Sequence, residues 1–276
     1  MTLRPWLWLP AISVLGCTLG YSEDELAGGT RPTAASACAD YRSAVAADAP
    51  LLWHSLDARG AEADATLNSG ITCSFGENVE FESDDRAEGC VGTRSVHVGF
   101  DPPSGARGFF TCEGAALGFS GSTGFTFEVW LMLPAALQGF PRIMSREWLS
   151  ANGREGYDVL VAADGAELQF ERWNADDSDG AYASLAPLLT TGFHHLVASY
   201  DGVTASLYVD GGLRSSAASV KQIASDPSAR FALGIAGYLV GEPGQGMDAR
   251  FDEAAVYAGA LSADRVLEHY RQGRGQ

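Results

Sequence analysis

The stretch FHHLVASYDGVTASLYVDG, residues 193–211, contains the pattern that decides the fold. Two runs rich in apolar residues, Phe193 to Tyr200 and Ala205 to Val209, each end in an Asp-Gly pair. Such runs are typical of β-strands, and Asp-Gly supplies the positive φ that a tight hairpin turn requires. The stretch therefore predicts two consecutive strands, each closed by a turn.

The same pattern extends outward from this stretch. From Phe125 to Leu133 every second residue is apolar, which indicates a half-buried strand. Tyr157 to Val161 and Glu167 to Trp173, joined through Asp164-Gly165, predict another hairpin. Further strands are predicted at Leu51 to Leu56, Ser95 to Phe100, Phe231 to Gly237 and Ala249 to Tyr257.

Only two helices are predicted, which argues against a parallel α/β sheet. One spans Ala37 to Ala47, and the other begins after Ser262 as N-cap and runs to about Arg271, burying Val266, Leu267 and Tyr270. Many short strands with turn signals and few helices indicate an all-β fold, an antiparallel sandwich of two sheets.

Composition sets limits on the partners of this chain. It has 276 residues, 46% apolar and 19% charged, enough to bury a core. Its net charge of −17 repels phosphate backbones, so nucleic acid is excluded as a partner. The sequence has no apolar run long enough to span a bilayer, and five histidines and five cysteines leave little material for a zinc cluster.

The N-terminus has the properties of an export signal. Residues 1–17 carry Arg4, an apolar stretch and the ending Val14-Leu15-Gly16-Cys17, which resembles the lipobox of bacterial lipoproteins. That resemblance implies a lipid on Cys17; the alternative is an ordinary signal with an incidental cysteine. Residues 18–36 predict a flexible tether, and residues 37–276 a single domain. Thr18, rather than Asp, favours the outer membrane by resemblance to enterobacterial sorting.

The other cysteines predict disulfides. Cys38, Cys73, Cys90 and Cys112 are an even number in an exported chain, and no Cys-x-x-Cys pair points to a metal. Three pairings are possible. We favour Cys73–Cys90, which closes a polar loop, together with Cys38–Cys112.

Several stretches resemble the laminin-G-like, concanavalin-A-like jelly-roll family. Residues 48–57 (DAPLLWHSLD) and 125–130 (FTFEVW) resemble its opening and first core strands. Residues 192–202 (GFHHLVASYDG) are similar to its WHHVAxTYDG strand, with Phe193 in place of Trp, and residues 251–264 resemble its DEVAIYxxALSxxE ending. The resemblance implies a jelly roll with a concave face that relatives use for glycans or proteins. It implies no particular ligand, because the fold hosts lectins, adhesion modules and glycosidases.

Catalytic carboxylates are not evident from the sequence. The nearest approach to a glycosidase strand is Glu82 to Glu88, a polar loop without alternating apolar residues. We expect the carboxylates to be scattered over turns instead of gathered in a cleft. The domain is therefore predicted to be non-catalytic.

Two other polar motifs are predicted to be structural. His194 and His195 are adjacent on a strand, so their side chains point to opposite faces and do not chelate one ion. Asn174 to Gly180 lacks the Gly and Glu of a calcium loop of the EF-hand type, and we predict an exposed hairpin tip or acidic loop.

The resemblance does imply a different calcium site. Family members often bind one structural Ca²⁺ where an early loop meets the strand with the Asp-Glu pair, and the matching residues are Asp64, Asp252 and Glu253. On a regular strand the side chains of Asp252 and Glu253 diverge, so only one would coordinate the ion. The alternative is a buried carboxylate bonded to backbone N–H groups.

Glycan recognition needs aromatic platforms and planar polar groups. The candidate ligand-binding residues are Trp148, Trp173, Arg172 and Asn174, with Arg146 and Arg154 nearby in sequence. The alternative for Trp173 is packing inside the sandwich.

The sequence as a whole predicts an exported, lipid-anchored protein of the cell envelope, at the outer membrane, that contacts the membrane only through its anchor. Its laminin-G-like domain is expected to bind a polysaccharide or an envelope or surface protein, with a calcium ion as the one candidate cofactor. The alternatives are a divergent glycoside hydrolase or lyase of the same fold and a purely structural envelope component.

Overall fold

The structure is a computed structural model. It describes residues 34–57, 70–76, 78–82, 94–101, 106–134, 137, 140–162, 165–189, 192–224, 226–236 and 246–276. The helices in these ranges are α1 (Ala34–Ala47) and α2 (Ala263–Gly273), with short 3-10 turns η1 (Ala115–Leu117) and η2 (Ala186–Leu189). The strands are β1 (Leu52–His54), β2 (Thr72–Phe75), β3 (Val79–Glu82), β4 (Ser95–Val98), β5 (Phe100–Asp101), β6 (Ala106–Arg107), β7 (Phe110–Glu113), β8 (Phe125–Met132), β9 (Arg142–Ser150), β10 (Gly153–Val161), β11 (Glu167–Asn174), β12 (Asp177–Ser184), β13 (His194–Tyr200), β14 (Thr204–Val209), β15 (Gly212–Ala218), β16 (Phe231–Leu233) and β17 (Ala249–Tyr257).

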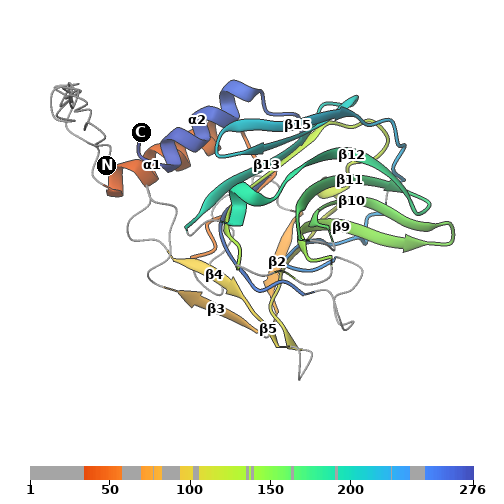
Figure 1. Ribbon diagram of the computed structural model, residues 1–276, viewed down its shortest axis with the longest axis horizontal. Helices are drawn as coiled ribbons and strands as arrows, with labels where there is room; N and C mark the ends of the chain where they lie inside the picture. The colour runs from red at the N-terminus through yellow and green to blue at the C-terminus, as the bar shows by residue number, and fades with distance from the viewer. Residues whose placement is uncertain are drawn as a thin grey trace, which may run out of the picture. The chain divides into compact units, whose positions relative to one another are not determined.

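Two antiparallel sheets form the predicted sandwich (Figure 1). Sheet A has the spatial order β15-β14-β13-β8-β17-β4-β3, with β1 also paired to β17. Sheet B has the order β12-β11-β10-β9-β16-β7-β2. Neighbours that lie far apart in the sequence, such as β8 and β17, mark the crossovers of a jelly roll. The all-β fold class is thus confirmed.

Two of the three predicted Asp-Gly turns close their hairpins as the sequence predicts, and Asp164 of the third lies outside the described residues. Asp201 Oδ1 accepts the backbone N–H groups of Val203 and Thr204, at 2.8 and 2.7 Å, and so orders the turn between β13 and β14. Between β14 and β15, Asp210 and Gly211 have φ values of +53° and +72°, the two positive values of a type I′ turn. These turns set the register of three consecutive strands in sheet A.

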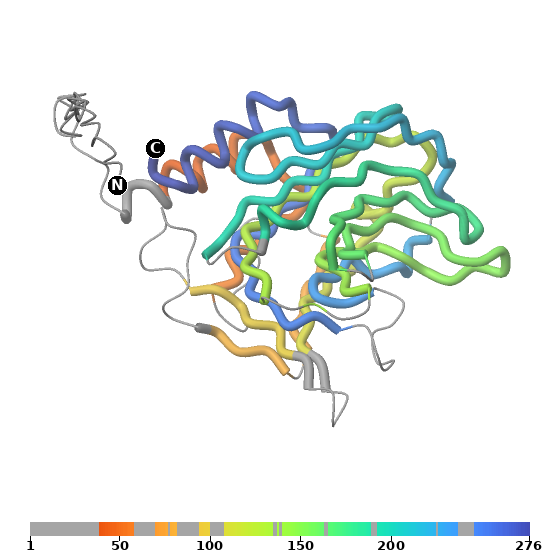
Figure 2. Tube along the Cα trace, viewed as in Figure 1, coloured from red at the N-terminus to blue at the C-terminus, as the bar shows by residue number. Residues whose placement is uncertain are grey.

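Alternation on β8 separates the core from a second apolar layer. Phe127 and Val129 face sheet B and belong to the main core, whereas Trp130 faces the other way and packs with α1 and α2. The two helices pack side by side on the outer face of sheet A (Figure 2). Residues on both faces of β8 are therefore buried, which explains why its central positions are closed to solvent.

The helices agree with the prediction in part. Ser262 caps α2, since its side chain accepts the N–H of Arg265, and Val266 is buried as predicted. Leu267 and Tyr270 are only half-buried, and the prediction missed the fully buried His269. The first helix begins at Ala34 rather than Ala37, and its end at Ala47 is as predicted.

The favoured disulfide pairing is wrong both for Cys73 and for Cys112, whose expected partner is Cys38. Cys73 is bonded to Cys112, not to Cys90, because β2 and β7 are neighbours and place the two cysteines directly opposite each other. Their Cα atoms are 4.1 Å apart. The predicted Cys73–Cys90 bond is based on closeness in the sequence, whereas the Cys73–Cys112 bond follows from the order of strands in sheet B. Cys90 and the side chain of Cys38 lie outside the described residues.

The predicted signal segment, Cys17 and most of the predicted tether also lie outside the described residues. Among the helices that the structure describes, none has the length and apolarity to cross a membrane.

Candidate functional site

Charged side chains gather on the outer face of sheet B. Val159 and Phe170 point into the core, so the neighbouring positions Asp158 and Glu171 point away from it. Asp158 and Glu171 lie directly opposite each other on β10 and β11. We call the charged set on this face, with contributions from three adjacent strands, the groove cluster: Arg142, Glu147, Arg154, Asp158 and Glu171.

Ion pairs link the groove cluster across its strands. Arg142 Nε lies 3.3 Å from Glu147 Oε2 and 3.2 Å from Asp158 Oδ2. Arg154 Nη1 lies 3.3 Å from Glu147 Oε1. The side chains of Glu147 and Asp158 have no exposed surface, although they lie on the face away from the core. These charges are therefore held in place and largely screened from water.

Trp173 adds an aromatic ring to the cluster. Its Nε1 donates to Asp158 Oδ1 at 3.2 Å, and the guanidinium of Arg154 lies over the ring, 3.1 Å from its centroid. The latter geometry is a cation–π contact. Trp173 is half-buried, so part of its surface stays open.

The groove cluster holds more acid than base. Burial, together with the charge of Glu147, raises the pKa of Asp158 well above its usual range, and Arg142 offsets this only in part. Burial also raises the pKa of Glu171, against a hydrogen bond from Ser178. Two arginines thus face three carboxylates. A proton on Asp158 balances the charge of the cluster.

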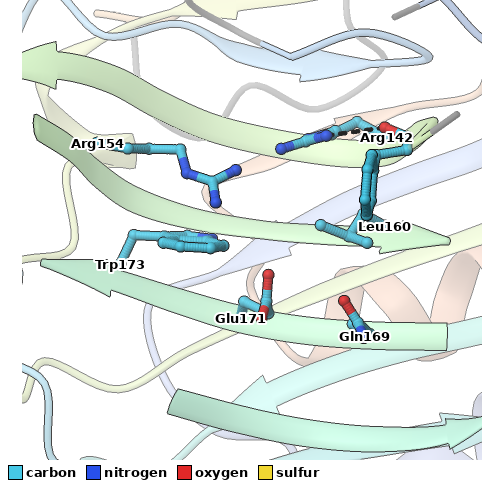
Figure 3. A pocket seen from close by; sticks show the side chains of 7 residues that line it. Arg142, Arg154, Leu160, Gln169, Glu171 and Trp173 are labelled. Carbon is cyan, nitrogen blue, oxygen red and sulfur yellow. Dashed lines mark hydrogen bonds between the residues drawn. The ribbon is translucent and has the colours of Figure 1, made fainter. Parts of the chain in front are cut away.

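A cavity of about 290 Å³ opens over this cluster. Figure 3 shows Arg154 against the ring of Trp173, with Glu171 and Gln169 beside it on the same strand. The volume lies just below the range of small-molecule sites, which begins at roughly 300 Å³. It suits one ring-sized ligand. The lining residues are Phe140, Arg142, Arg154, Leu160, Gln169, Glu171 and Trp173.

The structure brings only one of the four predicted ligand-binding residues to this cavity, Trp173. Trp148 is 9% exposed and packs in the main core. Arg172 is buried on the other face of β11, where it lies over the ring of Tyr200 and donates to Ser219 Oγ at 2.8 Å.

Asn174 lies at the end of β11 and its amide donates to Gln222 O. It does not line the cavity. The expected exposed hairpin tip is present here, with Ala175 and Asp176 between β11 and β12.

The expectation of scattered carboxylates is wrong. Glu147, Asp158 and Glu171 meet on one face because β9, β10 and β11 are neighbours in sheet B. The predicted strands do not include β9, so the sequence pattern does not place Glu147 beside Asp158. The available signal is an acidic residue next to an aromatic one in each strand: Glu147-Trp148, Tyr157-Asp158 and Phe170-Glu171. Of the polar loop predicted at Glu82 to Glu88, Glu82 is instead the last residue of β3, and residues 83–88 lie outside the described residues.

The adjacent histidines point to opposite faces, as predicted. His194 Nδ1 is 2.9 Å from Asp210 Oδ2 near the edge of the sandwich. His195 is fully buried on the outer face of sheet A, and its Nε2 lies 2.9 Å from Glu128 Oε1.

The predicted calcium residues form a different buried cluster. Glu253 has φ +51° at a bulge in β17, and it accepts from Trp53 Nε1 at 2.8 Å and from Arg42 at 2.9 Å. Burial raises the pKa of Glu253 to about 7. Asp252 is also fully buried, and neither of its carboxylate oxygens has a hydrogen-bond partner among the residues that the structure describes. Burial and the charge of Glu253 raise its pKa well above the usual range.

A calcium ion needs six to eight oxygen ligands. The orphaned carboxylate of Asp252 suits a cation, but the described residues include no group of three or more His, Cys, Asp or Glu that could hold a metal. Asp64, the third predicted ligand, lies outside the described residues. The residues that the structure describes therefore do not make up a calcium site by themselves.

Solved structures of similar fold are known. The botulinum neurotoxin serotype D binding domain matches with a TM-score of 0.59 at 11% identity, over 81% of this chain and 52% of that one. The serotype G binding domain matches with a TM-score of 0.58 at 15% identity, over 80% and 50%. The binding domain of Paraclostridial Mosquitocidal Protein 1 gives 0.59 at 11%, over 80% and 52%. This chain spans about half the length of each, and at such identities the likeness concerns the fold.

No curated protein matches the sequence. A family model does match, over residues 108–267, which is more than half of the chain and includes β8 to β17. Together with the two-sheet topology, this match confirms the predicted resemblance: the chain belongs to the concanavalin A-like lectin/glucanases superfamily.

Proposed function

We propose that this chain is a non-catalytic binding module that holds one sugar unit of a glycan in the cavity over the groove cluster. The observation that carries the proposal is the meeting of Trp173, Glu171 and two arginines, Arg142 and Arg154, at one cavity of about 290 Å³, with the buried carboxylates of the groove cluster ion-paired to these arginines. The similar solved structures are themselves described as binding domains, which supports the same class of function.

A sugar fits the chemistry of this lining. Each hydroxyl both donates and accepts hydrogen bonds, and the groove cluster offers guanidinium donors beside carboxylate acceptors. Trp173 supplies an apolar ring against which the C–H face of a sugar packs. With a proton on Asp158 the cluster has no net charge, which favours a neutral ligand over an ion.

A glycan-array screen of the full chain tests this proposal, followed by affinity measurements on the best ligand. Trp173→Ala and Glu171→Gln are expected to weaken binding by roughly 10- to 100-fold, as for the loss of a hydrogen bond to a charged group or of an aromatic contact. Leu149→Ala is the matched control, because Leu149 is 65% exposed on the same face but does not line the cavity. Binding that survives both groove variants would place the ligand elsewhere.

One observation favours a second candidate, a glycoside hydrolase or lyase. Glu171, whose pKa is raised by burial, lines the cavity, and Asp158 lies directly opposite it on β10; glycosidases use a pair of carboxyl groups. Incubating the array ligand with the chain and measuring new reducing ends or unsaturated products separates the two. Product that disappears in Asp158→Asn would establish the enzyme, whereas an intact ligand supports the binding module.

A lack of any glycan ligand would favour the remaining alternatives, an envelope or surface protein as partner or a purely structural role. Pull-down with purified envelope proteins would then separate these two. A protein partner is expected to be insensitive to Trp173→Ala if it uses another face.

The proposed location is the cell envelope, with a lipid on Cys17 and no other contact with the membrane. The lipobox-like Val14-Leu15-Gly16-Cys17 supports this placement. Cys17→Ser is expected to move the protein from the membrane fraction to the soluble fraction. A variant that stays with membranes would contradict the anchor.

The calcium ion stays a prediction from sequence, with Asp252 as its best-supported ligand. A bound cation would compensate the unpartnered carboxylate of this residue. If calcium binds there, chelator is expected to lower the melting temperature of the parent chain but not that of Asp252→Asn. Equal melting temperatures with calcium and with chelator would exclude the ion.

A further inference from the structure

Another buried carboxylate, that of Glu128, lies on the outer face of sheet A beneath the two helices. Its Oε1 is 3.0 Å from Tyr41 Oη and 2.9 Å from His195 Nε2. Its Oε2 is 2.8 Å from Tyr257 Oη and 2.9 Å from His269 Nδ1. The donors come from α1, β13, β17 and α2. A carboxylate that accepts from all of them is ionised, and burial is outweighed by the two histidines, which hold its pKa well below the usual range.

His269 connects this carboxylate to the end of α1. Its Nδ1 lies 2.9 Å from Glu128 Oε2, and its Nε2 lies 2.9 Å from Asp48 Oδ2. A hydrogen on each ring nitrogen lets His269 donate toward both carboxylates, whereas in the neutral ring one nitrogen only accepts, and Arg265 Nη2 lies 3.4 Å from Nε2 as a donor for it. The two short distances to carboxylate oxygens suit the imidazolium cation. We call this set the Glu128 cluster: Glu128, Tyr41, Asp48, His195, Tyr257 and His269.

Every element packed around His269 contributes a polar group. The titratable or charged groups that face it are Glu128 of β8, His195 of β13, Tyr257 of β17, Tyr41 of α1, Asp48 just after α1 and Arg265 of α2. Burial lowers the pKa of His269, but the charges of Glu128 and Asp48 outweigh it, so this pKa lies above its usual value of 6.5. Arg265 opposes the increase.

Arg265 also determines the geometry after His269 loses its proton. Its Nη2 lies 3.4 Å from His269 Nε2, and its Nε lies 2.8 Å from Asp48. A neutral His269 that keeps its hydrogen on Nδ1 turns a lone pair on Nε2 toward the Asp48 carboxylate, which is repulsive. That lone pair instead accepts from Arg265. The contact between α2 and the end of α1 is then weaker.

We propose that His269 is a proton-dependent clasp: the imidazolium ties α2 to Glu128 of sheet A and to Asp48 at the end of α1, and deprotonation releases Asp48. The device lies outside the groove and does not depend on the proposed ligand. Because the pKa of His269 is higher in the folded protein than in the unfolded chain, its contribution is complete below about pH 6.5 and is lost as the pH rises through the folded-state pKa. Docking of α1 is thus expected to loosen under alkaline conditions.

Two measurements on the full chain test the clasp. Histidine-selective NMR is expected to show one ring, assigned by its absence in His269→Gln, that is protonated on both nitrogens at about pH 6 and titrates above 6.5. Hydrogen exchange, corrected for its intrinsic pH dependence, is expected to accelerate in α1 and α2 by roughly 10- to 100-fold between about pH 6 and pH 9, the ratio for losing one charged hydrogen bond. Peptides from β7, which contributes to neither cluster, serve as the internal reference.

Variants separate the clasp from ordinary packing. Asp48→Asn removes the anion at Nε2 but leaves Glu128, so exchange in the helices is expected to be fast already at about pH 6 and almost independent of pH. If His269→Gln does not fold, Asp48→Asn can assign the His269 signal instead, because the loss of the neighbouring anion is expected to lower the pKa of this ring. His97→Gln is the control, because His97 pairs with Asp248 outside the cluster. A neutral His269 at about pH 6, or helix protection that does not change with pH in the parent chain, would overturn the proposal.

Discussion

The Glu128 cluster and the groove cluster are both built around buried carboxylates, yet they differ in how these are compensated. Glu128 is a single carboxylate with hydrogen-bond donors from four elements, closed off by two helices. The groove cluster has three carboxylates for two arginines and opens to a cavity. A carboxylate whose oxygens are saturated with hydrogen-bond donors holds the donor-bearing elements together. A carboxylate with too few positive or donor groups around it (an under-compensated carboxylate), next to an opening, favours a proton or a polar ligand.

The largest effect is expected from Glu128→Ala. It leaves four buried donors without an acceptor, one of them the charged His269, and is expected to lower the free energy of unfolding by about 3–5 kcal/mol. Urea denaturation followed by far-UV circular dichroism measures the change.

The groove provides the matched control for this variant. Glu171→Gln removes a carboxylate whose charged form is disfavoured by burial. The unfolding free energy of this variant is expected to differ from that of the parent chain by less than about 1 kcal/mol. If the two variants lose the same stability, the distinction between a saturated and an under-compensated carboxylate is wrong.

A smaller effect of opposite sign is expected from Asp158→Asn. Because folding raises the pKa of Asp158, the parent chain is most stable where this group is protonated and loses stability as the pH rises through the folded-state pKa. The amide escapes that loss and still accepts from Trp173, so the variant is expected to be about 1 kcal/mol more stable near pH 8. The gain should vanish as the pH falls toward 4, and a destabilised variant near pH 8 would show that the ionised Asp158 is needed for folding.

The smallest effect is expected from Arg154→Gln, which removes the cation over the ring of Trp173 and one ion pair of Glu147. The expected cost is about 0.5–1 kcal/mol of unfolding free energy, the range for a partly exposed cation–π contact. Acrylamide is expected to quench the tryptophan fluorescence of this variant more strongly. Arg230→Gln, which breaks an exposed pair with Glu113, is the control and should change neither quantity. Unchanged quenching in Arg154→Gln would mean that the guanidinium does not cover the ring.

Local signals predict most of the fold and little of the site. The strand at 249–257 has the predicted bounds, and the turn at Asp210-Gly211 has the predicted backbone geometry, because alternation and positive φ act over a few residues. Trp148 shows the opposite case. The sequence predicts that it binds ligand, but it packs in the core, because it lies on the same face of β9 as Met144, opposite to the face that carries Glu147.

Strand order explains the remaining differences. Cys73 is bonded to Cys112 because β2 lies beside β7, and Glu147 meets Asp158 because β9 lies beside β10. His269 and Glu128 are 141 residues apart and come together only when α2 packs on sheet A. Nothing in the neighbourhood of these residues in the sequence encodes such pairs.

By itself, the sequence determined that this chain is a two-sheet antiparallel sandwich, since strand period and turn chemistry are properties of short segments, and the resemblance of its motifs pointed to the concanavalin-A-like family. The tertiary structure alone decided which carboxylates share a site and which are sealed beneath helices. The physical reason is that the pKa and the partners of a buried charge depend on neighbours contributed by distant strands, and a one-dimensional pattern does not specify that neighbourhood.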